Sequence, residues 1–257
     1  MPRIASVLLA TLVAASPAAA AQSFTGEYAV SFLGFTVARS TFDSTFGNDT
    51  FSVKGRVASA GLAELFDSTR GTISSTGRFD GKTTQPSAFR VDYTEGAKSQ
   101  TTAIRFRGGA VTKTVNVPPL KKRGNDWVPL QQSHLRSVTD PISATLVRAD
   151  SLGEVCGRTI RVYDGEMRAD LRLEPESENA LAVPGFEGKT VTCRVRFVPV
   201  AGYRQGRRAL EFLKNRSQIR IAFAQLGTTG VYAPVHAKVG TQIGTLTVSA
   251  RRFETGK

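Results

Sequence analysis

The segment Thr139-Asp140-Pro141-Ile142-Ser143-Ala144-Thr145-Leu146-Val147-Arg148-Ala149-Asp150 is the clearest helical pattern in a sequence that otherwise has the patterns of β-strands. The Asp140 carboxylate is placed to accept hydrogen bonds from the free amides of a first helical turn, and Pro141 suits the first helical position. Ile142, Leu146 and Ala149 recur at i, i+4 and i+7, which is one face of an α-helix. A single helix of this kind among many strands predicts a curved sheet wrapped around it.

The rest of the chain alternates apolar residues with polar or small ones, which is the period of a half-buried strand. Tyr28, Val30 and Phe32 show the pattern near the start of the chain. Asp80-Gly81 and Asp164-Gly165 are strong signals for two-residue hairpin turns. We find no internal repeat, so we predict one all-β, mainly antiparallel domain over residues 22–257. Its expected form is a curved sheet, a β-spiral or open barrel, wrapped around a short central helix.

Three local features break the strand pattern. Gly55 lies inside a predicted strand, where a glycine often marks a β-bulge. The stretch Gly61–Asp67 changes to helical spacing, and core packing at the end of a barrel is favoured over an apolar tip that touches a membrane. Residues 177–188 are polar and contain Pro184-Gly185, which predicts a loop.

The N-terminus has the pattern of a cleaved signal peptide. Arg3 supplies a positive charge, residues 4–15 form an apolar run, and small residues follow up to Ala21. The run is short for a membrane span, so a membrane anchor is the less favoured alternative. We therefore expect residues 1–21 to be removed during export. We also expect a periplasmic product with no transmembrane segment after cleavage.

The chain has two cysteines, Cys156 and Cys193, with 36 residues between them. An oxidising compartment makes a disulfide between them the expected state. Cys193 shares a strand face with Val191 and Val195, which predicts that it points into the core. A catalytic thiol is the alternative, but the sequence lacks the C-x-x-C spacing typical of redox sites.

The sequence is strongly basic, with 34 Lys and Arg against 21 Asp and Glu, a net charge of +13. Such a charge steers anionic partners toward a protein. An exported protein rarely meets nucleic acid, so anionic lipid, glycan or wall polymers are the expected partners. The candidate contact residues follow Gly202 in the sequence. They are Arg204, Arg207, Arg208, Lys214 and Arg216. A solvated, non-binding face is the alternative interpretation of the same charges.

The sequence contains no recognisable catalytic constellation. No nucleophile elbow, Walker loop or dinucleotide fingerprint is present, so we expect no cofactor. His134 and His236 are isolated from each other and from the cysteines, so we predict no metal site. Carboxylates are scattered along the chain, which leaves a pair of the glycosidase type open.

Several short motifs resemble a family of exported bacterial proteins, domain of unknown function 3108. The resemblance begins with residues 140–144, Asp-Pro-Ile-Ser-Ala, and continues with Asp164-Gly165 and with Cys193 before a basic strand and Gly202. Residues 234–237 and 244–246 are similar to the closing hairpin of the family, whereas residues 222–225 depart from its pattern. The family has no assigned activity. A looser likeness in architecture links the chain to periplasmic β-spiral envelope-integrity proteins, which implies a disulfide and a sheet wrapped on a helix.

These observations favour a non-enzymatic cell-envelope protein whose β scaffold binds a lipidic, glycan or protein partner. A periplasmic hydrolase that uses carboxylates is the alternative. The geometry of the folded chain discriminates between them, because binding requires a concave apolar groove and hydrolysis requires two carboxylates that face each other across a polar cleft.

Overall fold

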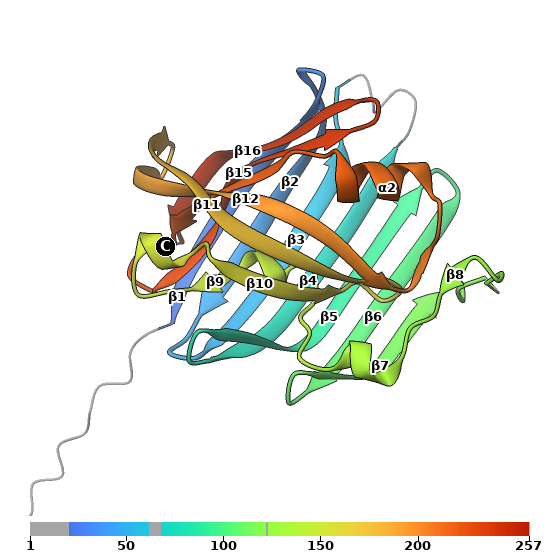
Figure 1. Cartoon of the computed structure of the whole chain (residues 1–257). Helices are drawn as coiled ribbons and strands as arrows, with labels where there is room; N and C mark the ends of the chain where they lie inside the picture. The colour runs from blue at the N-terminus through green and yellow to red at the C-terminus, as the bar shows by residue number, and fades with distance from the viewer. Residues whose placement is uncertain (1–20, 62–67, 122, 257) are drawn as a thin grey trace, which may run out of the picture.

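The computed structural model describes residues 21–61, 68–121 and 123–256. Fourteen of the described strands form one strongly curved sheet (Figure 1). Thirteen of them follow the order β10-β11-β12-β14-β15-β16-β1-β2-β3-β4-β5-β6-β7, and β9 pairs with β15 beside this path. The neighbouring strands are antiparallel, so the predicted antiparallel, curved and open sheet is confirmed.

The bounds of the elements follow the chain. The first half of the sheet contains β1 (Gln22–Phe32), β2 (Phe35–Phe46), β3 (Thr50–Ser59), β4 (Thr69–Asp80), β5 (Thr83–Glu95), β6 (Lys98–Arg107) and β7 (Ala110–Val117). A connecting region holds β8 (Trp127–Val128), β9 (Val147–Arg148) and the 3-10 helices η1 (Gln132–Leu135), η2 (Ser143–Thr145) and η3 (Leu152–Glu154). The second half contains β10 (Arg158–Tyr163), β11 (Arg168–Val183), β12 (Phe186–Ala201), β13 (Tyr203–Arg204), α2 (Arg208–Asn215), β14 (Ile219–Gln225), β15 (Val231–Thr241) and β16 (Gly244–Thr255).

A short piece of chain lies between the two edge strands of the sheet, β7 and β10. Arg136 forms an isolated bridge with Ala110 of β7, and the Val138 amide donates to the Gly109 carbonyl at 3.1 Å. The next residue, Thr139, contacts the other edge strand, because its amide donates to the Arg161 carbonyl of β10 at 2.8 Å. These bonds satisfy edge groups that an open sheet otherwise leaves unpaired.

The inner face of the sheet is packed tightly at one end. We call this the closed end; it carries the turns β2–β3, β4–β5 and β6–β7. Five of its phenylalanine side chains are at most 5% exposed, namely Phe24, Phe46, Phe51, Phe79 and Phe253. The opposite end, which carries the β1–β2 and β15–β16 turns, is called the open end. Inward-facing residues such as Val57, Tyr93 and Val248 are only half-buried toward it.

Residues 140–149, here called the plug, lie inside the curve at the closed end. The predicted central helical segment is present, but its predicted length is wrong, because only Ser143–Thr145 is helical. Leu146 is already extended, and Val147 pairs with Tyr232 of β15. The Ala149 amide then donates to the Gly230 carbonyl at 3.0 Å. Strand partners therefore replace the hydrogen bonds that a longer helix would make within itself.

Two other local predictions are wrong, and two more fall outside the described residues. Residues 177–188 are not a loop, because β11 and β12 continue through them to a tight turn at Pro184-Gly185. Gly55 forms no bulge, since the pairing of β3 with both neighbours is regular there. Residues 62–67 of the predicted helical turn, and residues 1–20 of the predicted signal peptide, lie outside the described residues.

The predicted disulfide is present between Cys156 and Cys193, with their Cα atoms 5.7 Å apart. Cys193 is fully buried on the inner face of β12, and Cys156 is 6% exposed. The bond therefore fastens the loop that follows the plug to β12, the third strand from the β10 edge of the sheet.

Candidate binding site

The plug is held by a buried carboxylate. Asp140 is fully buried, and its Oδ1 accepts from the amides of Ile142 and Ser143, both at 2.9 Å. Its Oδ2 accepts from the Ser143 hydroxyl at 2.6 Å and from the Ser75 hydroxyl of β4 at 2.9 Å. Burial raises the pKa of Asp140, while these four donors oppose that effect. Asp140 therefore accepts from the amides of the first helical turn, as predicted. Its contact with Ser75 also joins the plug to the sheet.

An apolar cavity of about 200 Å³ lies between the plug and the inner face of the sheet. It is lined mainly by aromatic and aliphatic side chains from β1, β2, β15, β16 and the plug. Among them are Tyr28, Phe42, Ile142, Leu146, Val248 and Phe253. The Tyr28 hydroxyl donates to the Pro234 carbonyl at 2.9 Å, and burial raises its pKa well above the ordinary value. The Tyr28 hydroxyl is therefore neutral and has a hydrogen-bond partner.

Two glycines on the inner face make room for the aromatic rings of this cavity. A Cβ atom at Gly26 would lie 2.8 Å from the Tyr28 ring, and one at Gly55 would lie 2.4 Å from the Phe42 ring. The two rings pack edge to face with centroids 5.9 Å apart. The glycine that the sequence suggested as a bulge thus allows Phe42 to lie flat against β3 and to form the cavity wall.

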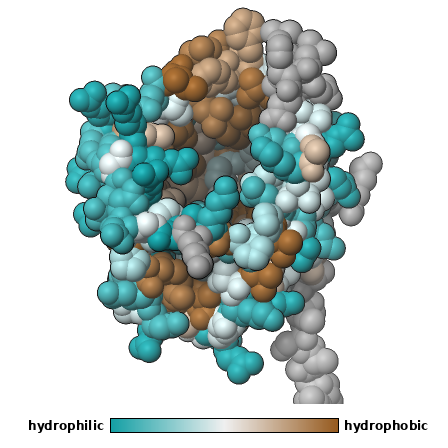
Figure 2. Space-filling model, turned by 90° about the vertical axis from the view of Figure 1, so that its right-hand side faces the viewer, coloured by the Kyte–Doolittle hydropathy of each residue, from teal (hydrophilic) through white to brown (hydrophobic). Residues whose placement is uncertain are grey.

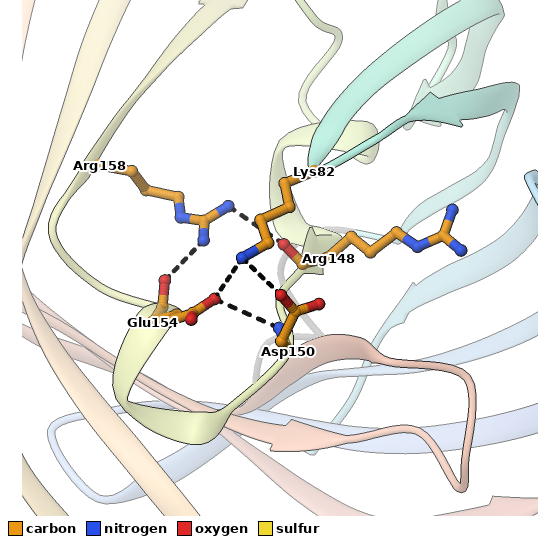
Figure 3. Close-up of polar contacts among 5 residues, drawn as sticks. All are labelled: Lys82, Arg148, Asp150, Glu154 and Arg158. Atoms are coloured by element: carbon orange, nitrogen blue, oxygen red, sulfur yellow. Dashed lines mark hydrogen bonds and ion pairs between the residues drawn. The ribbon is translucent and has the colours of Figure 1, made fainter.

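A polar cleft of about 560 Å³ lies on the other side of the plug, between the β4–β5 turn and β10. At its rim the Lys82 ammonium lies 2.8 Å from the Asp150 carboxylate and 2.6 Å from the Glu154 carboxylate (Figure 3). The Arg158 guanidinium donates to the main-chain carbonyls of Glu154 at 2.5 Å and Arg148 at 3.4 Å. We call Lys82, Asp150, Glu154 and Arg158 the rim cluster.

The charges of the rim cluster favour a structural role, in which ion pairs connect two loops. The hydrogen bond from Lys82 lowers the pKa of Glu154, so this carboxylate is ionised at neutral pH and is a poor proton donor. Bonds to Asp150 and Glu154 raise the pKa of Lys82, which keeps the amine protonated and unable to act as a nucleophile. The cluster ties the β4–β5 turn to the loop that carries Cys156.

The five basic residues proposed for anion contact lie between β13 and the end of α2. Arg204 is ion-paired with Asp126 at 2.5 Å. With Arg207 it lines a pocket of about 430 Å³ that also contains Arg123 and Trp127. The Arg123 guanidinium lies 4.1 Å from the centre of the Trp127 ring and is ion-paired with Glu166.

The other three basic residues lie on α2 or directly after it, at the open end (Figure 1). Arg208 begins this helix, Lys214 lies in its last turn and Arg216 follows it. The Ser217 hydroxyl donates to the Gly240 carbonyl at 2.7 Å, and this contact fastens the end of α2 to β15. Arg207 directly precedes Arg208, so the predicted anion contact runs from β13 along α2 and stays a prediction.

Sequence reasoning missed the apolar residues exposed at the open end. Leu33 in the β1–β2 turn and Phe35 directly after it are 62% and 67% exposed, and Ile243 in the β15–β16 turn is 78% exposed. Figure 2 shows hydrophobic surface gathered at this end, above a hollow in the face of the molecule. Phe35 followed a turn in the sequence, but nothing in the strand alternation distinguished it from a core residue.

The chain matches the model of a protein family over residues 27–251, and the family is described as a protein of unknown function, DUF3108. The chain belongs to the DUF3108 family. This confirms the resemblance seen in the motifs around Asp140 and Cys193. No curated protein matches the chain at a significant level.

A solved structure similar to this DUF3108 protein is a β-barrel-like protein of domain of unknown function DUF1849 from Brucella abortus. The two share 8% sequence identity, and the match covers 92% of this chain and 98% of the other, with a TM-score of 0.49. Within the described residues of the DUF3108 chain, no helix is long and apolar enough to cross a membrane. The same residues contain no group of His, Cys, Asp and Glu that could hold a metal ion.

Proposed function

We propose that this DUF3108 protein is an exported cell-envelope protein that binds a lipid-like ligand inside its curved sheet. The observation that carries the proposal is the apolar cavity between the plug and β1–β2, which lies on the concave side of the sheet. Ligand sites are typically concave and apolar, with a few polar groups that are placed by the fold. The signal-like N-terminus and the disulfide support an oxidising compartment outside the cytoplasm.

The size of the cavity supports a chain-like ligand. Its volume is about 200 Å³, and an apolar cavity of roughly 150 Å³ is already large enough to hold a benzene molecule. A segment of an acyl chain fits such a space, with the rest of the ligand in the hollow toward the open end. Ser40 and Val248 line the cavity on the side of that hollow.

The proposal includes no catalytic step, and the rim cluster supports this. Both carboxylates at the mouth of the polar cleft are bound to Lys82, and Asp140 accepts four hydrogen bonds within the plug. A hydrolase of the two-carboxylate type needs one carboxyl group that keeps a proton near neutral pH and faces the substrate. The lowered pKa of Glu154 opposes that role.

Binding of a fluorescent long-chain fatty acid tests the proposed function. Ser40→Leu places a larger side chain in the cavity, and we expect it to weaken binding about tenfold, which corresponds to about 1.4 kcal/mol. Thr41→Leu is the matched control, because Thr41 is the next residue on the same strand and points to the opposite face. The proposal fails if the unaltered protein does not bind the probe, or if the two variants bind it equally well.

A further inference from the structure

Three exposed apolar residues lie close together at the open end. The β1 and β16 strands pair up to Phe32 and Leu246, so the β1–β2 and β15–β16 turns are neighbours. The Leu33 amide donates to the Thr245 carbonyl at 3.4 Å, and a Cβ atom at Gly244 would lie 2.6 Å from a Leu33 methyl group. Leu33, Phe35 and Ile243, which we call the apolar tips, therefore form one protruding group.

The backbone at Leu33 argues that its side chain is needed there. Leu33 has φ of +49° and Gly34 has φ of +89°, so both turn residues occupy left-handed conformations. Turns of this kind favour Asn-Gly, because a leucine at positive φ is strained. Here a strained residue also exposes 62% of a large apolar side chain to solvent. Neither folding nor solubility favours leucine at this position, and such strain commonly occurs at functional sites.

Positive charge lies beside the apolar tips. The end of α2 is fastened to Gly240, three residues before Ile243, which is on the order of 10 Å along the strand. Lys214 and Arg216 are exposed at this end of the helix. Among the described residues, no carboxylate lies within ion-pair distance of either side chain. The open end thus combines protruding apolar side chains with flanking cations.

We propose that the open end docks onto the surface of an anionic lipid bilayer. The apolar tips insert at the boundary between headgroups and acyl chains, and Lys214 and Arg216 contact the lipid phosphates. Apolar groups rimmed by Lys and Arg are the combination that interfacial membrane binding requires, because burial of apolar area and attraction to anionic lipid add together. The charge complementarity selects a membrane over a second copy of this basic chain, which would repel it. This inference rests on the surface of the open end and is independent of the cavity.

Sedimentation with lipid vesicles tests the docking. We expect the protein to bind vesicles that contain phosphatidylglycerol and to bind pure phosphatidylcholine vesicles at least tenfold more weakly. Phe35→Ser and Ile243→Ser should each weaken binding to the anionic vesicles about tenfold. Leu120→Ser is the matched control, since Leu120 is 46% exposed but lies outside the apolar tips. It should leave vesicle binding unchanged.

The charge is tested separately. The double variant Lys214→Gln with Arg216→Gln should weaken binding to anionic vesicles several-fold and reduce its dependence on salt. Lys54→Gln with Lys113→Gln removes the same charge from exposed positions on β3 and β7, and this control should retain most of the binding. Equal losses from the two double variants would mean that net charge alone drives adsorption, which overturns the docking proposal.

Leu33→Asn separates docking from folding. Asparagine tolerates positive φ, so we expect the variant to be as stable as the unaltered protein or more so, while its vesicle binding falls about tenfold. Binding of the fluorescent fatty acid should persist, which distinguishes a failure of docking from a failure of ligand binding. Unchanged vesicle binding in Leu33→Asn, or conversion of dimers to monomers by the tip variants without loss of vesicle binding, contradicts the proposal.

Discussion

The two ends of the curved sheet are built in opposite ways. At the closed end the plug, the disulfide and the rim cluster fill and fasten the interior, and five phenylalanine side chains of the inner face are at most 5% exposed. At the open end the inner face is half-buried, and three large apolar side chains at the turns are more than 60% exposed.

The contrast separates the interactions that stabilise the fold from the surfaces that we propose for binding. Burial of apolar area stabilises a protein, so residues that remain exposed contribute little to folding. Interactions that hold the structure can therefore concentrate at the closed end, while the open end remains available to a ligand or a surface. The following predictions test this division, from the largest expected effect to the smallest.

The disulfide should contribute most to the closed end. Replacing both Cys156 and Cys193 by alanine should lower the free energy of unfolding by roughly 4 kcal/mol, because the unfolded chain regains the entropy of a loop whose ends are 37 positions apart. Urea unfolding monitored by circular dichroism measures the loss. Unaltered protein unfolded with a reducing agent is the control and should show a similar loss. An unchanged midpoint in the double variant would show that the closed end does not depend on this bond.

Two leucines compare the ends directly. Leu146→Ala in the plug should lower the free energy of unfolding by about 3 kcal/mol, since the 6% exposed side chain leaves a cavity in the core. Leu33→Ala at the open end should change it by less than about 0.5 kcal/mol, because the side chain is already solvated. Denaturant melts of both variants provide the measurement. Equal losses of unfolding free energy in the two variants would show that the two ends contribute equally to stability.

The Asp140 carboxylate is predicted to hold the plug to β4. Asp140→Ala should lower the free energy of unfolding by about 2 kcal/mol, because it leaves the Ser75 and Ser143 hydroxyls and two amides without their acceptor. Asp140→Asn should lower it less, since the amide oxygen still accepts a hydrogen bond. A larger loss for asparagine than for alanine would mean that these donors find other partners.

The smallest expected effect belongs to the exposed rim cluster. The fold lowers the pKa of Glu154, so its ion pair stabilises the fold above the ordinary pKa of 4.5. This stabilisation is lost as the pH falls through the lower pKa of the folded state. Lys82 has a raised pKa, so its contribution is present below 10.5 and is lost as the pH rises through the higher folded value. Lys82→Met should therefore have a lower free energy of unfolding than the unaltered protein between these two pH limits. The two free energies of unfolding should become equal in acid. A difference that persists at pH 2 would assign the effect to packing.

The contacts of Arg148 could not be predicted from the sequence, where it lies off the apolar face of the predicted helix. In the folded chain its guanidinium bonds to Asp49 at 2.7 Å and to the Asn48 carbonyl at 3.1 Å, and it lies 5.3 Å from the centre of the Phe79 ring. Asp49 and Asn48 are 99 and 100 positions away in the sequence, so no local pattern could identify them. The same limitation applies to Lys82 and Glu154, which meet across the mouth of the cleft.

The sequence alone determined the class of fold and several specific contacts within it. Strand alternation predicted the antiparallel sheet, because side-chain period reports directly which face is buried. The two cysteines, one of them on an apolar strand face, predicted the disulfide, and Asp140 before a helical turn predicted its amide contacts. Each of these inferences depends only on local chemistry or on a pairing with no competing partner.

Tertiary structure decided the extent of the central helix, the cavity and the two unequal ends. Ile142, Leu146 and Ala149 satisfy the helical period, yet the chain leaves the helix at Leu146 because β15 offers backbone partners to Val147 and Ala149. The cavity depends on Gly26 and Gly55 admitting rings from other positions. Leu33 and Phe35 have the apolar character of core residues and are exposed only because no segment of the described chain covers their turn. Burial is a property of what lies opposite a side chain, and residues distant in the sequence supply it.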